Sequence, residues 1–116
     1  MNRVNNLNKY LKYWQIRLNL QGWKLNLELN DFNRKDYPQS GDIKVDLENK
    51  KATIFISKDD TGIDKKIILH ELIHLILWDL DLYSEQWIPE DNKGDYFGKL
   101  ESTVERITNT ILHQDE

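Results

Sequence analysis

The run over residues 67–78 is the most apolar in the chain, and it carries two histidines and a glutamate. Residues four apart lie on one face of an α-helix, so His70 and His74 should point the same way, with Glu71 about 100° round the axis. Imidazoles bind zinc, and a neighbouring carboxylate can take the proton of a zinc-bound water. This H-E-x-x-H arrangement is typical of zinc hydrolases. Because such groups are costly in an apolar helix unless something satisfies them, a metal site is favoured over two core histidines hydrogen-bonded to backbone.

Length, charge and cysteine content limit the class of protein. The chain has 116 residues, a formal net charge of −4 and no cysteine. This length predicts one domain over residues 1–116. Without cysteine there are no disulfides or thiolate ligands, so histidine and carboxylate must hold any metal. The acidic balance argues against nucleic acid as the main partner. We expect a cytoplasmic location and no membrane partner, because residues 1–6 do not resemble a signal peptide and the run 67–78 is too short to span a bilayer.

The N-terminal half predicts one helix and three strands. Apolar residues three and four apart predict a helix over 5–19 that stops at Gln21-Gly22 and covers one face of a sheet. Strict alternation of apolar and polar residues predicts a half-buried strand at 23–30. Two further strands, at 43–47 and 52–57, should form an antiparallel hairpin. The expected fold class is therefore α+β.

The C-terminal half predicts two helices. The first, over 64–80, is apolar nearly all round and should be the buried central helix, with Asp60, Thr61 or Asp64 as its cap. The second, over 96–112, has an apolar stripe on one side. Residues 81–95 contain proline, asparagine and glycine and are expected to form a loop, which at this length in a small domain is often a functional lip or lid.

A catalytic zinc needs a third protein ligand beyond the two histidines. The metzincin pattern is excluded, because it requires a glycine and a ligand where Leu77 and Leu80 stand. The last helix is the natural source. Glu101 lies about 90° from the centre of its apolar stripe and Glu105 about 130°, so Glu101 should face the motif helix more closely. Glu105 and His113 stay open as alternatives, although His113 is roughly 18 Å further along the helix than Glu101.

Residues 69–77, followed by the helical segment 100–107, resemble the small zincin-like metallopeptidases of phages and mobile elements, which are related to the ImmA/IrrE-type and SprT-like groups. The resemblance implies a minimal zincin-like domain, with an N-terminal helix, a three-stranded, mainly antiparallel sheet, a buried H-E-x-x-H helix and a C-terminal helix. In the gluzincin pattern the second motif is a glutamate on a downstream helix, which corresponds to Glu101. SprT-like proteins use a third histidine instead, which keeps His113 open.

The resemblance also implies a mechanism. Zn²⁺ would be bound by His70, His74 and Glu101, and Glu71 would activate the zinc-bound water to hydrolyse a peptide bond. The substrate would be a protein or peptide, and such small enzymes can act on one specific partner protein. In zincins the last strand before the motif helix is usually an edge to which the substrate adds, which corresponds here to strand 52–57.

Other functions are compatible with part of this pattern. A non-catalytic, zinc-stabilised protein-binding or regulatory module would keep the three ligands but would not need Glu71. A DNA-associated protease of the SprT-like kind would need a basic patch, against which the acidic balance argues. A plain structural domain would bind no metal. The chain does not identify the group that stabilises the oxyanion: Tyr83, Tyr96 and Lys99 are near the site in sequence, but nothing distinguishes them.

Overall fold

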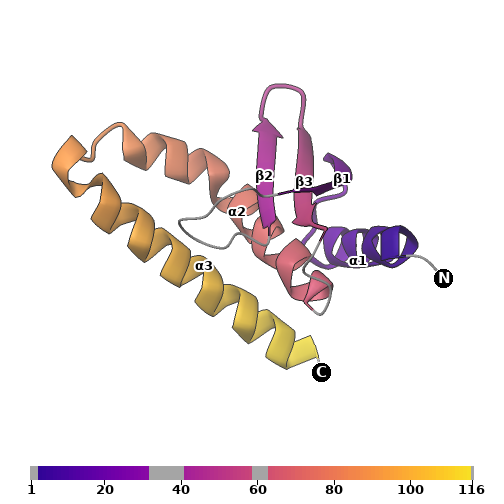
Figure 1. The fold of residues 1–116 in the computed structure, drawn as a ribbon. Helices are drawn as coiled ribbons and strands as arrows, with labels where there is room; N and C mark the ends of the chain where they lie inside the picture. Colours follow the sequence, from indigo (N-terminus) through magenta and orange to yellow (C-terminus); the bar gives the residue numbers. More distant parts are fainter. Residues whose placement is uncertain (1–2, 32–40, 59–62, 116) are drawn as a thin grey trace.

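The computed structural model describes residues 3–31, 41–58 and 63–115 and has an α+β fold, as predicted (Figure 1). Three helices and a three-stranded sheet follow one another along the chain. Their bounds are α1 Arg3–Arg17, β1 Lys24–Asn30, β2 Gly41–Asp46, β3 Lys51–Ser57, α2 Asp64–Glu85, a short 3₁₀ helix η1 at Glu90–Asn92, and α3 Lys93–Asp115.

The sheet has the strand order β1-β3-β2, which places β3 in the centre. The predicted hairpin is confirmed: β2 and β3 are antiparallel, with Ile43 opposite Ile54. The expectation of a mainly antiparallel sheet is wrong, because β1 pairs with β3 in parallel and the sheet is mixed. The expectation that strand 52–57 is an edge is also wrong. β3 is the most apolar strand, and its inward residues Ala52, Ile54 and Ile56 are buried, as suits a strand with a neighbour on each side.

The first helix ends earlier than Gly22, because Asn19 takes the left-handed conformation with φ of 61°. The Asn19 N–H donates to the Ile16 carbonyl and the Leu20 N–H to the Gln15 carbonyl, which is the Schellman pattern. Asparagine tolerates this conformation better than most residues do. The helix therefore closes on its own carbonyls two residues before the predicted end.

Helix α1 packs mainly against α2, and only its end lies against β1, so the prediction that it covers a sheet face holds only marginally. Trp14 of α1 is fully buried, and its indole Nε1 donates to the carbonyl of Lys65 in α2 at 3.2 Å. Arg3 pairs with Asp64 at 2.8 Å and thereby ties the start of α1 to the start of α2. Asp64 thus lies in the first turn of α2. The N-cap is Ile63, without a side-chain cap, and the other two cap candidates lie outside the described residues.

Helix α2 is the central element, as predicted, and contacts α1, α3, β2 and β3. Both C-terminal helices are longer than predicted. α2 continues to Glu85 and α3 begins at Lys93, so most of the predicted loop 81–95 is helical. Only Pro89 acts as a break, at the N-cap of η1, whereas Gly94 lies inside α3. The prolonged ends form a projecting helical hairpin, residues 76–99, which we call the arm (Figure 1).

The far end of α3 is held against the body by Asp115. Its carboxylate accepts a hydrogen bond from the Tyr13 hydroxyl at 2.6 Å and contacts the Lys65 ammonium at 2.9 Å. These contacts fix the position of α3 across α2, which sets which of its side chains meet the histidines. Within the described residues, no helix is both long and apolar enough to cross a membrane.

Candidate metal centre

The two histidines of the motif lie on one face of α2, as the four-residue spacing predicts. Their ring centroids are 5.0 Å apart, and both side chains are about 15% exposed. α3 crosses this face and brings Glu101 to it. The residues around them on α2 are apolar and buried, so the histidines form a polar strip in an apolar helix.

The carboxylate of Glu101 meets the Nε2 atoms of both histidines. One oxygen lies 2.7 Å from His74 Nε2 and the other 3.3 Å from His70 Nε2. Ligand atoms of the three residues all lie within 4.8 Å of one another. Bonds of about 2.0–2.2 Å to one zinc ion would place tetrahedral ligand atoms roughly 3.4 Å apart, so this donor set fits the ion. A carboxylate oxygen can only accept, so each of these contacts needs either an N–H on Nε2, which a neutral or a protonated imidazole can carry, or a metal ion between the two atoms.

Glu105 contacts the other side of the His70 ring. Its carboxylate lies 3.0 Å from His70 Nδ1, while its second oxygen pairs with Lys66 at 2.6 Å. Glu101 and Glu105, one helical turn apart, therefore approach opposite nitrogens of one imidazole. A carboxylate that accepts from Nδ1 fixes the tautomer in which Nε2 is free to bind a metal. Sequence reasoning missed this role for Glu105 and missed Lys66 altogether, because neither has a spacing signal.

The structure places Glu101 beside both Nε2 atoms, but the argument from the apolar stripe gave the wrong physical reason. The Glu101 side chain is 59% exposed and that of Glu105 is 41% exposed, so Glu105 lies deeper in the protein. What distinguishes them is position along α2. Glu101 lies opposite the gap between His70 and His74, whereas Glu105 lies one turn further towards Lys66.

The pKa values of Glu101, His70 and Glu105 reflect these contacts. Hydrogen bonds to His70 and His74 hold the pKa of the Glu101 carboxyl well below its usual range. Burial works to lower the pKa of His70, but the Glu101 hydrogen bond and the nearby carboxylate charges outweigh it and raise that pKa. The hydrogen bond from Lys66 is the main cause that lowers the pKa of the Glu105 carboxyl. Without a metal, the lowered pKa of Glu101 and the raised pKa of His70 favour an ion pair between these two side chains.

Glu71 is the buried carboxylate of the site, with only 7% of the residue exposed. Burial raises its pKa to about 7, against the opposing charges of His74 and His70. None of the residues that the structure describes donates a hydrogen bond to the Glu71 carboxylate. The backbone of Gly41 lies against it: a Cβ built at Gly41 would be 3.2 Å from Glu71 Oε2 and 2.5 Å from Ile67 Cγ2. A glycine is therefore needed here for close approach, although in the sequence it is indistinguishable from a loop glycine.

A cavity of about 880 Å³ opens over these side chains. The start of β2 forms one wall and the arm the other. Glu71 lies at its base, within reach of a small molecule that enters. None of the three residues considered as oxyanion stabilisers lines it, and the Tyr96 hydroxyl instead donates to Asp81. Besides the two histidines, Glu71 and Glu101, the lining consists of Gly41, Asp42, Ile43, Ile63, Lys66, Ile67, Trp78, Asp81, Phe97, Gly98, Leu100 and Glu105.

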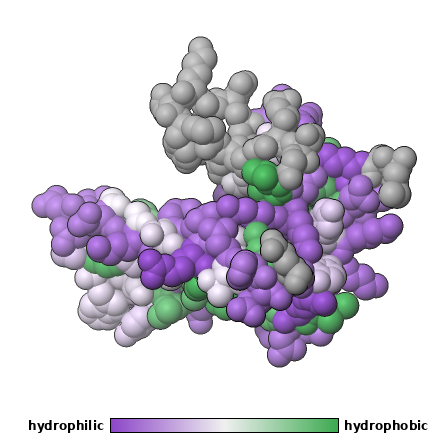
Figure 2. Space-filling model, turned by 90° about the horizontal axis from the view of Figure 1, so that it is seen from below, coloured by the Kyte–Doolittle hydropathy of each residue, from purple (hydrophilic) through white to green (hydrophobic). Residues whose placement is uncertain are grey.

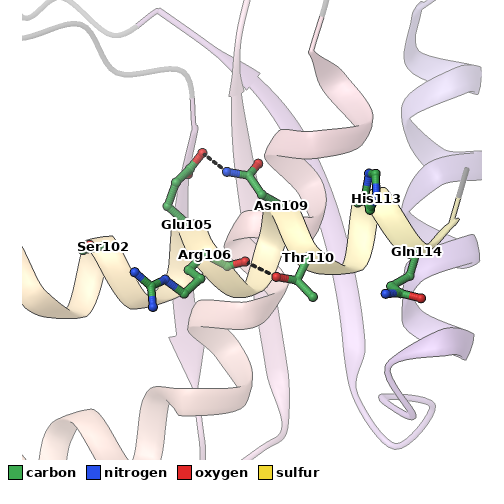
Figure 3. Close-up of a pocket in the computed structure, with 7 residues that line it drawn as sticks. All are labelled: Ser102, Glu105, Arg106, Asn109, Thr110, His113 and Gln114. Carbon is green, nitrogen blue, oxygen red and sulfur yellow. Dashed lines mark hydrogen bonds between the residues drawn. The ribbon is translucent and has the colours of Figure 1, made fainter.

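His113, the third candidate ligand, does not join the cluster. It lies on a shallow groove of about 580 Å³ along the outer side of α3, shown in Figure 3. Glu105 borders the same groove, roughly 12 Å along the helix axis from His113. All seven lining residues belong to this one helix, so no second element closes the groove into a site: Ser102, Glu105, Arg106, Asn109, Thr110, His113 and Gln114.

The candidate centre thus joins residues from two helices and a strand start: the imidazoles of His70 and His74, the carboxylates of Glu71 and Glu101, and the backbone of Gly41. Comparison with known proteins adds no family to this description: no protein-family model, curated protein or solved structure matches the chain.

Proposed function

We propose that the chain is a zinc-dependent metallopeptidase of the gluzincin type, with His70, His74 and Glu101 as ligands and Glu71 as general base. The observation that carries the proposal is the convergence of three ligand atoms within 4.8 Å beside a buried carboxylate, at the base of an open cavity. Two imidazoles and one carboxylate are a donor set typical of catalytic zinc.

The chemistry divides between the ion and the side chains. When bound, Zn²⁺ polarises the scissile carbonyl and makes water more acidic. Glu71 takes the proton of the attacking water and passes it to the leaving amine. In the zinc-free protein burial raises the pKa of Glu71 to about 7, and the positive charge of a bound zinc ion would lower it and favour the carboxylate form that a base needs. Within the described residues no hydrogen bond is donated to this carboxylate, and the backbone of Gly41 lies beside its Oε2 atom.

The peptide substrate is expected to lie beside β2, which corrects the role first given to strand 52–57. β2 is an edge of the described sheet, and its first residues, Gly41 to Ile43, line the cavity. An extended segment could add to this edge through main-chain hydrogen bonds, which give affinity with little sequence selectivity. β3, in contrast, already pairs with β1 on one side and with β2 on the other.

The test is metal content together with hydrolysis. The purified protein should hold one zinc per chain and cleave a library of unmodified peptides, with cleavage sites identified by mass spectrometry. Glu71→Gln should keep the zinc and abolish cleavage. Glu85→Gln, a change of the same kind at the half-buried C-terminal end of α2, is the matched control and should change neither.

The outcomes separate the alternatives. A wild-type protein without bound zinc at neutral pH would refute the metal centre and leave a structural domain. Stoichiometric zinc without cleavage of any peptide, in wild type and Glu71→Gln alike, would instead indicate the non-catalytic, zinc-stabilised module.

A further inference from the structure

The arm carries a stripe of exposed apolar side chains on α2. Ile76 is 47% exposed, Leu80 62% and Tyr83 61%. At 100° per residue these three lie within about 60° of one another on the helix. Trp87, just beyond the helix and 71% exposed, continues the row, since its ring centroid is 6.2 Å from that of Tyr83. We call these four residues the arm stripe.

The arm stripe prolongs a face of α2 that is buried in the body of the protein. Leu69 and Ile73 lie on the same side of the helix, about two turns and one turn before Ile76, and they are 0% and 3% exposed. Single exposed apolar residues are ordinary, but a contiguous row of large ones marks an interaction surface. In Figure 2 the arm, at the left of the view, shows green and pale atoms gathered beside purple ones.

The arm as a whole is acidic, although at 100° per residue Asp81 and Glu85 lie on the side of α2 away from the arm stripe. Residues 76–99 contain six carboxylates and two lysines, so the net charge of −4 on the whole chain is matched by this one segment. One of the lysines, Lys93, already faces Glu90 at 3.4 Å. The carboxylates are those of Asp79, Asp81, Glu85, Glu90, Asp91 and Asp95.

We propose that the arm stripe is a docking site for a partner protein segment that is helical, apolar on one face and rich in lysine or arginine beside it. The arm stripe would pack against the apolar face of the partner helix, as in other helix-in-groove complexes. The carboxylates of the arm would attract the lysine or arginine residues beside that face. An anionic membrane is excluded as the occupant by the same carboxylates, which it would repel.

A second copy of the chain fits less well than a basic partner. A symmetric contact would place the acidic arms against each other. α1 is basic, but its exposed apolar residues Val4 and Ile16 lie about 120° apart on that helix and make no stripe that could match. The described surface therefore favours a different protein.

The docking site is distinct from the cavity. The arm stripe and the histidines face directions on α2 that differ by roughly 130°, so a bound segment would leave the cavity open. Docking and hydrolysis can for this reason be tested separately, and the inference does not depend on the proposed activity.

The experiment titrates the full chain with an 18-residue helical peptide of leucine and lysine, by calorimetry. The control peptide has glutamate in place of lysine. The lysine peptide should bind and the glutamate peptide should not, and raising the salt concentration should weaken binding. The double variant Leu80→Ser/Tyr83→Ser should weaken it at least about tenfold. Ile16→Ser, an equally exposed apolar residue on α1, is the matched control and should bind as the wild type does.

Equal weakening by Ile16→Ser, equal binding of both peptides, or no binding of the lysine peptide would overturn the proposal. The proposal would also be overturned if sedimentation showed that the wild type is a dimer and that Leu80→Ser/Tyr83→Ser is a monomer, since the occupant would then be a second copy of the chain. Binding of the wild type, but not of the double variant, to vesicles of anionic lipid would also overturn it. Both replaced residues are exposed, so the melting temperature should change little and loss of binding cannot be ascribed to unfolding.

Discussion

Replacing Glu105 by alanine should weaken zinc binding without abolishing it. The carboxylate lies 3.0 Å from His70 Nδ1 and holds the ring with Nε2 towards Glu101. Loss of such a partner typically costs 10–100-fold in metal affinity. Because the Glu105 side chain is 41% exposed and also forms an ion pair with Lys66, we expect a loss of metal affinity at the lower end of this range, about tenfold or about 1.4 kcal/mol.

Three further variants separate the causes. Glu105→Gln keeps an oxygen that can accept from Nδ1 and should recover much of the affinity. Lys66→Met removes the ion pair but leaves the contact with His70, so its effect should be smaller than that of Glu105→Ala. Asn109→Ala is the control, because Asn109 contacts Glu105 at 3.5 Å and does not touch the imidazole.

Affinity is measured by competition with a chromophoric chelator, and the absorption spectrum of the Co²⁺ form reports ligand geometry. Glu105→Ala should shift the cobalt spectrum, whereas Asn109→Ala should leave it unchanged. If Glu105→Ala holds no metal while Glu101→Ala retains it, Glu105 is the ligand and the assignment is reversed. If the affinity of Glu105→Ala equals that of wild type, the contact with Nδ1 does not orient the ring.

Two other predictions concern Glu71. Gly41→Ala should lower the melting temperature and the hydrolysis rate while zinc stays bound, since its Cβ would be 2.5 Å from Ile67 Cγ2. Gly94→Ala, which has nothing within 4 Å of its Cβ and does not line the cavity, is the control and should lower neither. In zinc-free protein the pKa of Glu71 is raised from 4.5 to about 7, so its contribution to stability is complete below pH 4.5 and is lost as the pH rises through 7. Urea unfolding from pH 4.5 to 8 should show this decline in wild type relative to Glu71→Gln, and parallel curves would contradict it.

Local patterns sufficed to predict the elements. Strand periodicity of two and helix periodicity of 3.6 depend only on which side chains face the core, so the hairpin of β2 and β3 and the buried centre of α2 could be read directly. The pairing of His70 with His74 on one face follows from helix geometry alone. Element ends were less predictable, because Asn19 closes α1 through its backbone conformation and no breaker precedes Pro89 in the arm.

Tertiary structure decided everything that joins distant segments. The central place of β3 results from β1 pairing with it in parallel, and that pairing has no local signal in either strand. The choice between Glu101 and Glu105 depends on how far α3 is shifted along α2, which contacts such as Asp115 with Lys65 fix. The motif by itself therefore indicated His70, His74 and Glu71 as candidate site residues. The approach of Glu101 to both histidines and of Gly41 to Glu71 required the packed structure, because these contacts depend on distances between elements that are far apart in the sequence.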